Sequence, residues 1–295
     1  MKNSKGERVM EDILVLQHLI DELSPTIHVS LLDVSGIASH PAFGLDAAHT
    51  THTRPFCDAA KTTARGLRLC LSCKALTVKK AIQSMRMFTG ICPYGITETV
   101  CPVMSGGKLL CILYVGNVVC DSSALKKRIN KVCTLTGVPP AALLEQTNTL
   151  SHQDSKNACE HIARLIQSYI LLLFEHYKPV ISSDHHWAVT SLQNYAALYY
   201  NRDLQLHRLA RMLYLNENYL GRLFRKKTGV SFSEYVNSIR LSQACRLLTE
   251  GNDTVLAISL AVGFRNVAYF NRLFKRKMKK TPLQYRKQFD NSNKA

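Results

Sequence analysis

The feature that most constrains this chain is a segment near its C-terminal end that occurs twice. Residues 219–235 read YLGRLFRKKTGVSFSEY, and residues 269–285 read YFNRLFKRKMKKTPLQY. The two copies align without a gap at an offset of 50 residues, and they share Tyr, Arg, Leu, Phe and basic positions. A repeat of this kind predicts one structural unit that is built twice.

Each copy has the pattern of two helices joined by a tight turn. A short apolar segment precedes each copy, LHRLARML at 206–213 and VLAISLAVGF at 255–264. A short helix, a turn and a second helix with Arg on one face form the pattern of a helix-turn-helix. We therefore expect an all-α C-terminal part that contains two helix-turn-helix units.

The second helix of each copy divides into an apolar face and a polar face. The apolar face predicts a core made of Leu220, Leu223, Phe224, Phe270, Leu273 and Phe274. The polar face would enter the major groove of DNA, where Arg bonds guanine and Asn bonds adenine. The predicted base readers are Asn218, Gly221, Arg222, Arg225, Val267, Ala268, Asn271 and Arg272. Gly221 has no side chain, so we expect little discrimination between bases at that position.

Positive charge is concentrated in the same part of the chain. Residues 187–295 hold 19 Lys and Arg against 6 Asp and Glu, a net of +13, whereas residues 1–186 hold 19 against 15, a net of +4. Such a cationic segment predicts a polyanionic partner, with double-stranded DNA as the first choice. We expect contacts to phosphates from Lys226, Lys227, Lys275, Arg276, Lys277, Lys279 and Lys280.

Two other readings of the basic segment are solvated helix faces and binding to an acidic membrane surface. The coincidence of repeat, charge and helix pattern favours DNA over both. The longest apolar run, YILLLF at 169–174, is too short to span a bilayer, and the first residues lack the pattern of a signal peptide. We therefore expect a cytoplasmic protein without a membrane partner.

Residues 190–289 resemble the AraC family of transcription regulators. The resemblance is carried by the repeated segments, and it departs from the family at Ser259, where Ala is usual, and at the basic pair Lys279 and Lys280. It implies two helix-turn-helix units joined by a long helix near 232–249. Their recognition helices would enter successive major-groove segments on one face of the DNA, about one helical turn apart.

The N-terminal part has a mixed α/β pattern. Helical periodicity covers 8–23 and 158–177, alternation covers 26–36, and residues 102–120 read as strand, Gly-Gly turn and strand. The polar segment KPVISSDHH, with Pro179, follows the last helix. We therefore predict an α+β protein with a sensor domain at 1–180 and a DNA-binding domain at 181–295. The helix at 158–177 is either a dimer helix or a helix that packs onto its own sheet.

Nine of the ten cysteines lie in the first 186 residues. Cys57, Cys70, Cys73 and Cys92 supply four thiols, which would suit Zn²⁺ or an Fe–S cluster. The same cysteines could instead form a redox switch or stay reduced in a pocket, and Arg65, Arg68 and Lys74 could lower their pKa values if they lie near. His49 and His52 could add ligands or be solvated in a loop. The remaining cysteines are expected as small buried apolar side chains: Cys101, Cys111, Cys120, Cys133, Cys159 and Cys245.

The first domain resembles the PocR sensory domain over roughly residues 8–175. The resemblance rests on RPFCDAAKTTARGLRLC, GICPYGITETVCPV and LLCILYVGNVV, and it departs from the family at Pro93 and Cys73. It implies a PAS-like fold that holds a small organic ligand, in regulators of diol, glycerol and related catabolism. The expected effector-pocket residues are Phe56, Cys57, Cys92, Tyr94 and Glu98. Glu98 could face an alcohol or amine, or it could be an exposed strand residue.

These features predict a transcription regulator, an activator of a catabolic operon, controlled by a small metabolite. The effector signal would reach the DNA reader through helix 158–177, and the partners would include RNA polymerase and a second copy of the chain. The alternative is a metal- or thiol-redox-responsive regulator that uses the four cysteines. An enzyme is not expected, because the chain shows no nucleophile–base set, no Gly-rich phosphate loop and no H-E-x-x-H motif.

Overall fold

The computed structural model describes residues 16–23, 27–37, 45, 47–152, 155–177 and 186–292. These residues form two compact units. The first contains the described residues up to 194 together with 207–220, and the second contains 195–206 together with the described residues from 221 onward. The predicted boundary near residue 180, with the segment that contains Pro179, lies outside the described residues and stays a prediction.

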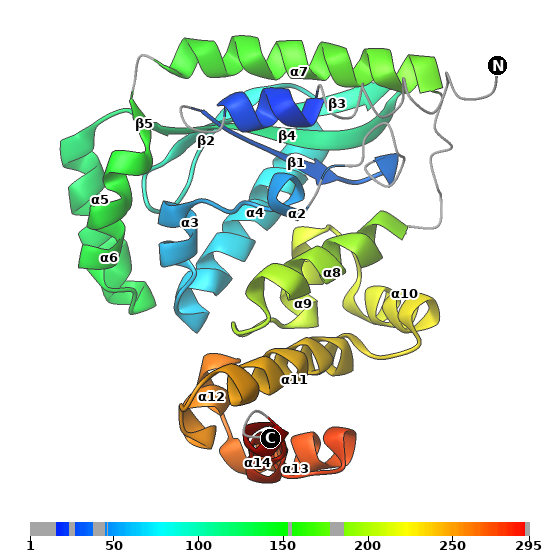
Figure 1. Ribbon diagram of the computed structural model, residues 1–295. Coiled ribbons are helices and arrows are strands. Elements are labelled where there is room, and N and C mark those ends of the chain that lie inside the picture. Colours follow the sequence, from blue (N-terminus) through cyan, green and yellow to red (C-terminus); the bar gives the residue numbers. More distant parts are fainter. Residues whose placement is uncertain are drawn as a thin grey trace. The chain divides into compact units, whose positions relative to one another are not determined.

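A five-stranded sheet is the framework of the first unit (Figure 1). Strands β1 (His28–Asp33), β4 (Lys108–Val119), β3 (Thr97–Ser105) and β2 (Phe88–Ile91) are neighbours in that order and are all antiparallel, and β5 (Ser151–His152) pairs parallel with β4. Gly106 and Gly107 join β3 to β4 with positive φ angles of 52° and 75°, as a two-residue hairpin turn requires. The strands predicted at 26–36 and 102–120 are confirmed.

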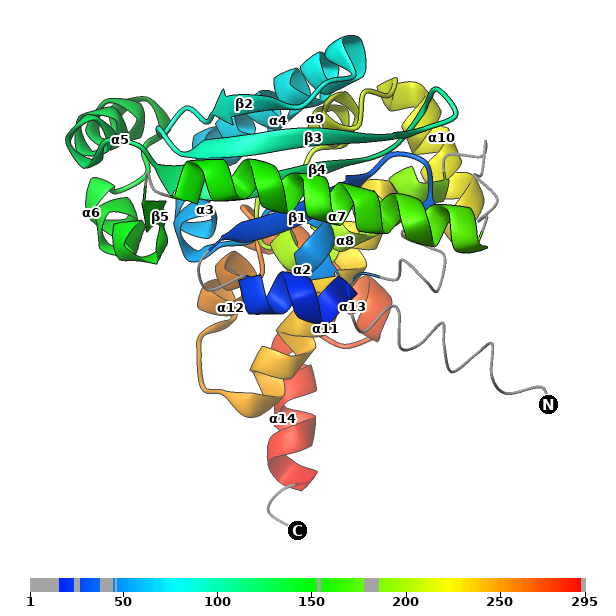
Figure 2. The same cartoon turned by 90° about the horizontal axis from the view of Figure 1, so that it is seen from above.

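Helix α7 (Ser155–Tyr177) covers one face of the sheet, together with the helical residues 16–23 (Figure 1). Ala163, Ile166 and Ile170 of α7 are fully buried in the core between this helix and the sheet. The predicted helix at 158–177 is confirmed, and it packs onto its own sheet along β3 and β4 (Figure 2). The predicted helix at 8–23 is confirmed for 16–23, and its first half lies outside the described residues.

The other face of the sheet carries α4 (Ala64–Ser84), which contacts β3 and β4. Helices α2 (Ala47–Thr50), α3 (Pro55–Ala60), α5 (Ser122–Thr136) and α6 (Pro140–Leu144) and the 3-10 helix η3 (Glu145–Thr149) complete this part. A second core lies here, in which Phe56 of α3 packs edge-on to Tyr94 with ring centroids 6.2 Å apart. The elements on this side enclose the cavity described below.

The remaining elements are helical, in agreement with the predicted all-α C-terminal part. They are α8 (His186–Tyr199), α9 (Leu206–Met212), α10 (Glu217–Thr228), α11 (Phe232–Glu250), α12 (Val255–Ala261), α13 (Val267–Met278) and α14 (Pro282–Ser292). Helix α11 confirms the long connecting helix that we predicted near 232–249. The α+β fold class is likewise confirmed, with a small sheet in the N-terminal part and helices alone in the C-terminal part.

Candidate nucleic-acid interface and sensor cavity

The sequence repeat is also a repeat of turn geometry. Each turn is closed by three hydrogen bonds of 2.8–3.1 Å from backbone amides to backbone carbonyls. In the first copy the amides of Leu213, Tyr214 and Leu215 donate to the carbonyls of Leu209, Arg211 and Ala210. In the second copy the amides of Val262, Gly263 and Phe264 donate to the carbonyls of Ile258, Leu260 and Ser259. The middle residue has a positive φ in both copies, 58° at Tyr214 and 97° at Gly263. The same turn is therefore built twice, and it precedes α10 in the first copy and α13 in the second. These are the two predicted recognition helices.

Asparagine begins both recognition helices. The Asn216 Oδ1 atom accepts a hydrogen bond from the Tyr219 amide at 3.2 Å, and the Asn266 Oδ1 atom accepts one from the Tyr269 amide at 2.9 Å. These bonds satisfy amides that the helix itself cannot pair at its first turn. The two helices therefore start at equivalent positions of the repeat.

The predicted division into a buried and an exposed face is present in both recognition helices. The six predicted core residues are 0–7 % exposed, which confirms the predicted core. Of the eight predicted base readers, six are exposed: Asn218, Arg222, Arg225, Ala268, Asn271 and Arg272. Val267 and Gly221 are half-buried.

Gly221 is placed differently from our expectation. A Cβ atom at this position would lie 3.2 Å from Cδ2 of Leu206, so the residue faces a neighbouring side chain. The absence of a side chain therefore allows close packing, and we no longer propose Gly221 as a base reader.

All seven residues predicted to contact phosphates are exposed. They lie at the C-terminal ends of α10 and α13 or directly after α13, where cations also interact favourably with the helix dipole. Lys279 ends α13 with a φ of 60°, and the Lys280 Nζ atom donates to Oε1 of Gln288 at 2.5 Å. These positions suit contacts that give affinity without sequence choice.

The first unit contains a cavity of about 60 Å³ between α3, α4 and the sheet. All five predicted effector-pocket residues lie in its wall, and so do the four cysteines of the predicted metal site. The lining residues are His52, Phe56, Cys57, Ala60, Cys70, Cys73, Lys74, Thr77, Cys92, Pro93, Tyr94, Ile96, Glu98, Tyr114 and Asn117. Segments far apart in the sequence thus meet at one small site.

The four cysteines of the predicted metal site all line this cavity. Among the residues that the structure describes, no group of three or more His, Cys, Asp or Glu side chains could hold a metal ion. Burial raises the pKa of Cys73 to about 11 and of Cys92 to about 12, and it also raises the pKa of Cys57, although Lys61 opposes the shift there. The expected lowering of these pKa values is therefore corrected, because burial outweighs the nearby cations. The four-thiol site stays a prediction.

The other cysteines divide into three kinds. Cys101, Cys111, Cys133 and Cys159 are buried, as we predicted for small apolar side chains, and Cys245 is half-buried. Cys120 is exposed, because it lies just beyond the end of β4, and the prediction was wrong there.

Glu98 and His52 are in polar contact inside the cavity, with 2.7 Å between Oε1 and Nε2. Burial opposes ionisation of Glu98, but the neighbouring His52 and Lys74 outweigh it and lower the pKa of Glu98 to about 2. Burial lowers the pKa of His52, which Glu98 partly offsets. Glu98 is therefore a cavity carboxylate and not an exposed strand residue. The alternative that His49 and His52 are solvated in a loop is corrected, because His52 contacts Glu98 and the Nε2 atom of His49 lies 2.8 Å from Oδ1 of Asp21.

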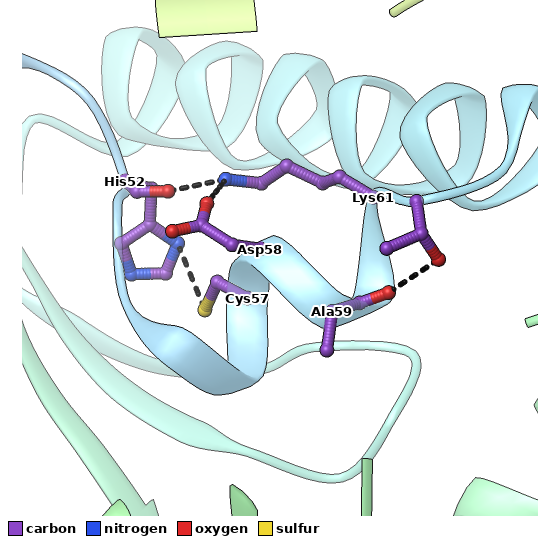
Figure 3. Close-up of polar contacts among 6 residues, drawn as sticks. His52, Cys57, Asp58, Ala59 and Lys61 are labelled. Carbon is purple, nitrogen blue, oxygen red and sulfur yellow. Dashed lines mark hydrogen bonds and ion pairs between the residues drawn. The ribbon is translucent and has the colours of Figure 1, made fainter. Parts of the chain in front are cut away.

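Figure 3 shows how the loop before α3 and α3 itself are tied together. The His52 Nδ1 atom lies 3.8 Å from the Cys57 Sγ atom, and the Lys61 Nζ atom donates to the His52 carbonyl and lies 3.5 Å from Oδ1 of Asp58. These contacts hold the His52 ring in the cavity wall, where it meets Glu98.

Sequence reasoning missed Lys74 and Asn117 as cavity residues. Burial lowers the pKa of Lys74 to about 8, and its Nζ atom lies 2.8 Å from the ring centroid of Tyr114. The spacing of Cys70, Cys73, Lys74 and Thr77 places them on one face of α4, which was an available signal. The signal for Asn117 was a polar residue inside an apolar strand.

Two repeated helix-turn-helix units and a small cavity beside the N-terminal sheet are typical of a DNA-binding regulator with a sensor. The family described as "Sensory domain found in PocR" matches residues 15–174, more than half of the chain. The family described as "Helix-turn-helix domain" matches residues 209–288. The chain therefore belongs to the family of PocR sensory-domain proteins, and its C-terminal part matches a helix-turn-helix domain.

The chain is similar to known transcription regulators. It is 30 % identical over 153 residues to the uncharacterized HTH-type transcriptional regulator YijO of Escherichia coli, covering 50 % of this chain and 52 % of that protein. It is 32 % identical over 93 residues to the Msm operon regulatory protein of Streptococcus mutans, covering 32 % of this chain and 34 % of that protein. The chain thus spans about half of YijO and a third of the Msm protein. Both relatives carry the names of regulators.

Among solved structures, the chain is similar to the C-terminal domain of the response regulator yesN from Fusobacterium nucleatum. The sequences are 33 % identical over 34 % of this chain and 97 % of that one, with a TM-score of 0.32.

Within the described residues, none of the helices has the length and apolar character needed to cross a bilayer.

Proposed function

We propose that this chain activates a catabolic operon in the cytoplasm and that a small metabolite in the cavity controls its DNA binding. The observation that carries the proposal is the cavity, because its wall unites the five residues that we predicted for the effector pocket. Its modest volume fits a short molecule, such as a diol, glycerol or a related metabolite. RNA polymerase and a second copy of the chain are the further partners in this proposal.

On the DNA side, we propose Arg222, Arg225, Asn271 and Arg272 as the main base readers. Each is an exposed Arg or Asn on a recognition helix, and these residue types make bidentate hydrogen bonds to guanine or adenine. Asn218, Ala268 and Val267 would contribute at the beginning of their helices. The seven basic residues after these positions would bind phosphates.

A hydrogen bond offers a route for the effector signal in addition to α7. The Asn194 Nδ2 atom on α8 donates to Oγ1 of Thr50 at 2.9 Å. Thr50 lies two residues before His52 of the cavity wall, and Asn194 is the last residue of the first unit before the chain passes to the second. An effector that shifts the loop at His52 would therefore act on α8, provided that it binds one state better than the other.

The test is a thermal-shift screen of the full chain with diols, glycerol, amines and sugars. A ligand that binds the folded chain raises its melting temperature, by an amount that corresponds to about 2.7 kcal/mol at a hundredfold excess over Kd. Cys73→Leu enlarges a side chain in the cavity wall and should abolish the shift. Cys120→Leu makes the same change at an exposed cysteine outside the cavity and should keep it. A ligand that stabilises wild type and Cys73→Leu equally would place the effector elsewhere.

A further inference from the structure

A β-bulge in β4 places Asn117 at the cavity. Gly116 pairs with Glu98 and Val118 pairs with Thr97, so Asn117 is an extra residue without a register partner on β3. Its φ is 80°, in the left-handed region that Asn tolerates better than most residues. Bulges of this kind occur beside functional sites, where they redirect a side chain.

The side chain of Asn117 is 1 % exposed and lines the cavity. Neither its Oδ1 atom nor its Nδ2 atom has a hydrogen-bond partner among the described residues. A buried amide without partners is costly, and such groups in folded proteins are normally paired. The bulge therefore places the Nδ2 donor and the Oδ1 acceptor of Asn117 in the cavity wall, where a bound molecule can form hydrogen bonds with both.

The charged groups of the wall indicate the charge of that molecule. Glu98 contacts His52, whose pKa is lowered by burial, and Lys74 lies over the Tyr114 ring. With His52 neutral, the charged groups of the wall are one carboxylate and one ammonium, which offset each other. A ligand anion would add an uncompensated negative charge near Glu98, and a ligand cation would add a positive charge near Lys74. Either would be costly at a buried site, so the wall favours an uncharged ligand.

We propose that Asn117 is the residue that recognises the effector, by donating to one oxygen and accepting from one hydroxyl or N–H group of a short uncharged molecule. The proposal rests on the effector function proposed above, and it adds the reading residue and the ligand's charge. The apolar part of the ligand lies against Phe56 and Ile96, which are buried in the same wall.

A matched series of three-carbon probes tests the ligand class on the full chain. Propane-1,2-diol and lactamide are uncharged, lactate is an anion and 1-aminopropan-2-ol is a cation, and all share the same hydroxylated end. Calorimetric titration should show the two uncharged probes binding at least tenfold more tightly than the two charged ones. Tighter binding of lactate or of the amine would overturn the charge argument. Absence of binding by all four would overturn the ligand class, while stabilisation by another molecule of the thermal-shift panel would leave the sensor function standing.

Two variants test Asn117 itself. Asn117→Gly removes the amide and relaxes the positive φ, so the chain should remain folded with an unchanged or higher melting temperature. It should bind the uncharged probes about tenfold more weakly, because their polar groups lose this partner. Asn117→Asp keeps the size but loses the donor and should also weaken binding. Wild-type affinity in Asn117→Gly would show that the effector is recognised by other residues, with the proposed function intact.

Discussion

Arg222 and Lys279 are both exposed cations of the repeated units, but they differ in position. Arg222 lies on the polar face of α10, and Lys279 lies at the end of α13. We predict that Arg222→Ala costs roughly 1–3 kcal/mol at the specific site and relaxes choice at one base position. Lys279→Ala should weaken binding to all sequences alike and reduce the salt dependence. Gel-shift titrations against specific and random duplexes measure both effects.

The contrast between the two variants is the test of our assignment. Equal losses of affinity on specific and random DNA for both variants would show that Arg222 binds backbone and not bases.

His28 makes the stability of the sensor unit depend on pH. It is 5 % exposed, its ring lies 4.8 Å from the His52 ring, and burial followed by the His52 charge holds its pKa well below 6.5. Above pH 6.5 this residue is neutral in both folded and unfolded chains. Below pH 6.5 the His28 ring is protonated in the unfolded chain but stays neutral in the folded chain. The free energy of unfolding therefore falls as the pH falls.

Urea unfolding at about pH 7.5 and about pH 5.5 measures this loss. His28→Phe removes the titrating group and should reduce the difference between the two pH values, although His52 continues to contribute, because its pKa is lowered as well. A pH dependence identical to wild type in His28→Phe would contradict the role of His28.

At the residue scale, the sequence predicted the groups that resemble known motifs and missed those that depend on tertiary contacts. The cavity positions Phe56 and Cys57 were identified from the family pattern, and Glu98 was identified as an acidic candidate for the pocket. Asn117 could not be found in this way, because its direction depends on a bulge in the pairing of two strands. The four-cysteine metal site stays a prediction for a related reason, since cysteine spacing reports neither the distances between the thiols nor their burial.

The helix that follows each recognition helix begins with the same capping arrangement. Ser231 and Glu234 form a capping box at α11, and the Thr281 and Gln284 side chains bond each other's backbone amides at α14. We predict that Ser231→Ala lowers the free energy of unfolding by about 1 kcal/mol. Ser238→Ala, in the middle of α11, should change it far less, because Ala is a good helix former.

Urea unfolding of the full chain and the two variants measures the effect. Equal changes for Ser231→Ala and Ser238→Ala would mean that the capping box does not stabilise α11.

At the element scale, periodicity predicted α7, α11 and the central hairpin, whereas the long helices α4 and α5 were not predicted. The helices at 158–177 and 232–249 and the Gly-Gly turn carry strong local signals, and each is present. The short strand β5 and the helices α2 and α6 were not predicted. Each of them has only 2–5 residues, so it is fixed by its neighbours and not by its own sequence pattern.

At the scale of the whole molecule, the two family matches leave residues 175–208 between them. This interval contains α8, whose Asn194 bonds Thr50 of the sensor unit. The predicted boundary near 180 lies inside the interval. The proposed path from effector to DNA therefore runs through a segment that neither family match covers, and composition alone could not identify it.

Selection of binding sites from a random duplex pool by the full chain tests the central claim, that both copies of the repeat read DNA bases. The account predicts two blocks of specified bases about one helical turn, roughly 10 base pairs, apart, with Arg222→Ala relaxing only one block and Arg272→Ala only the other. A single block of specified bases, or binding without any sequence enrichment, would contradict it.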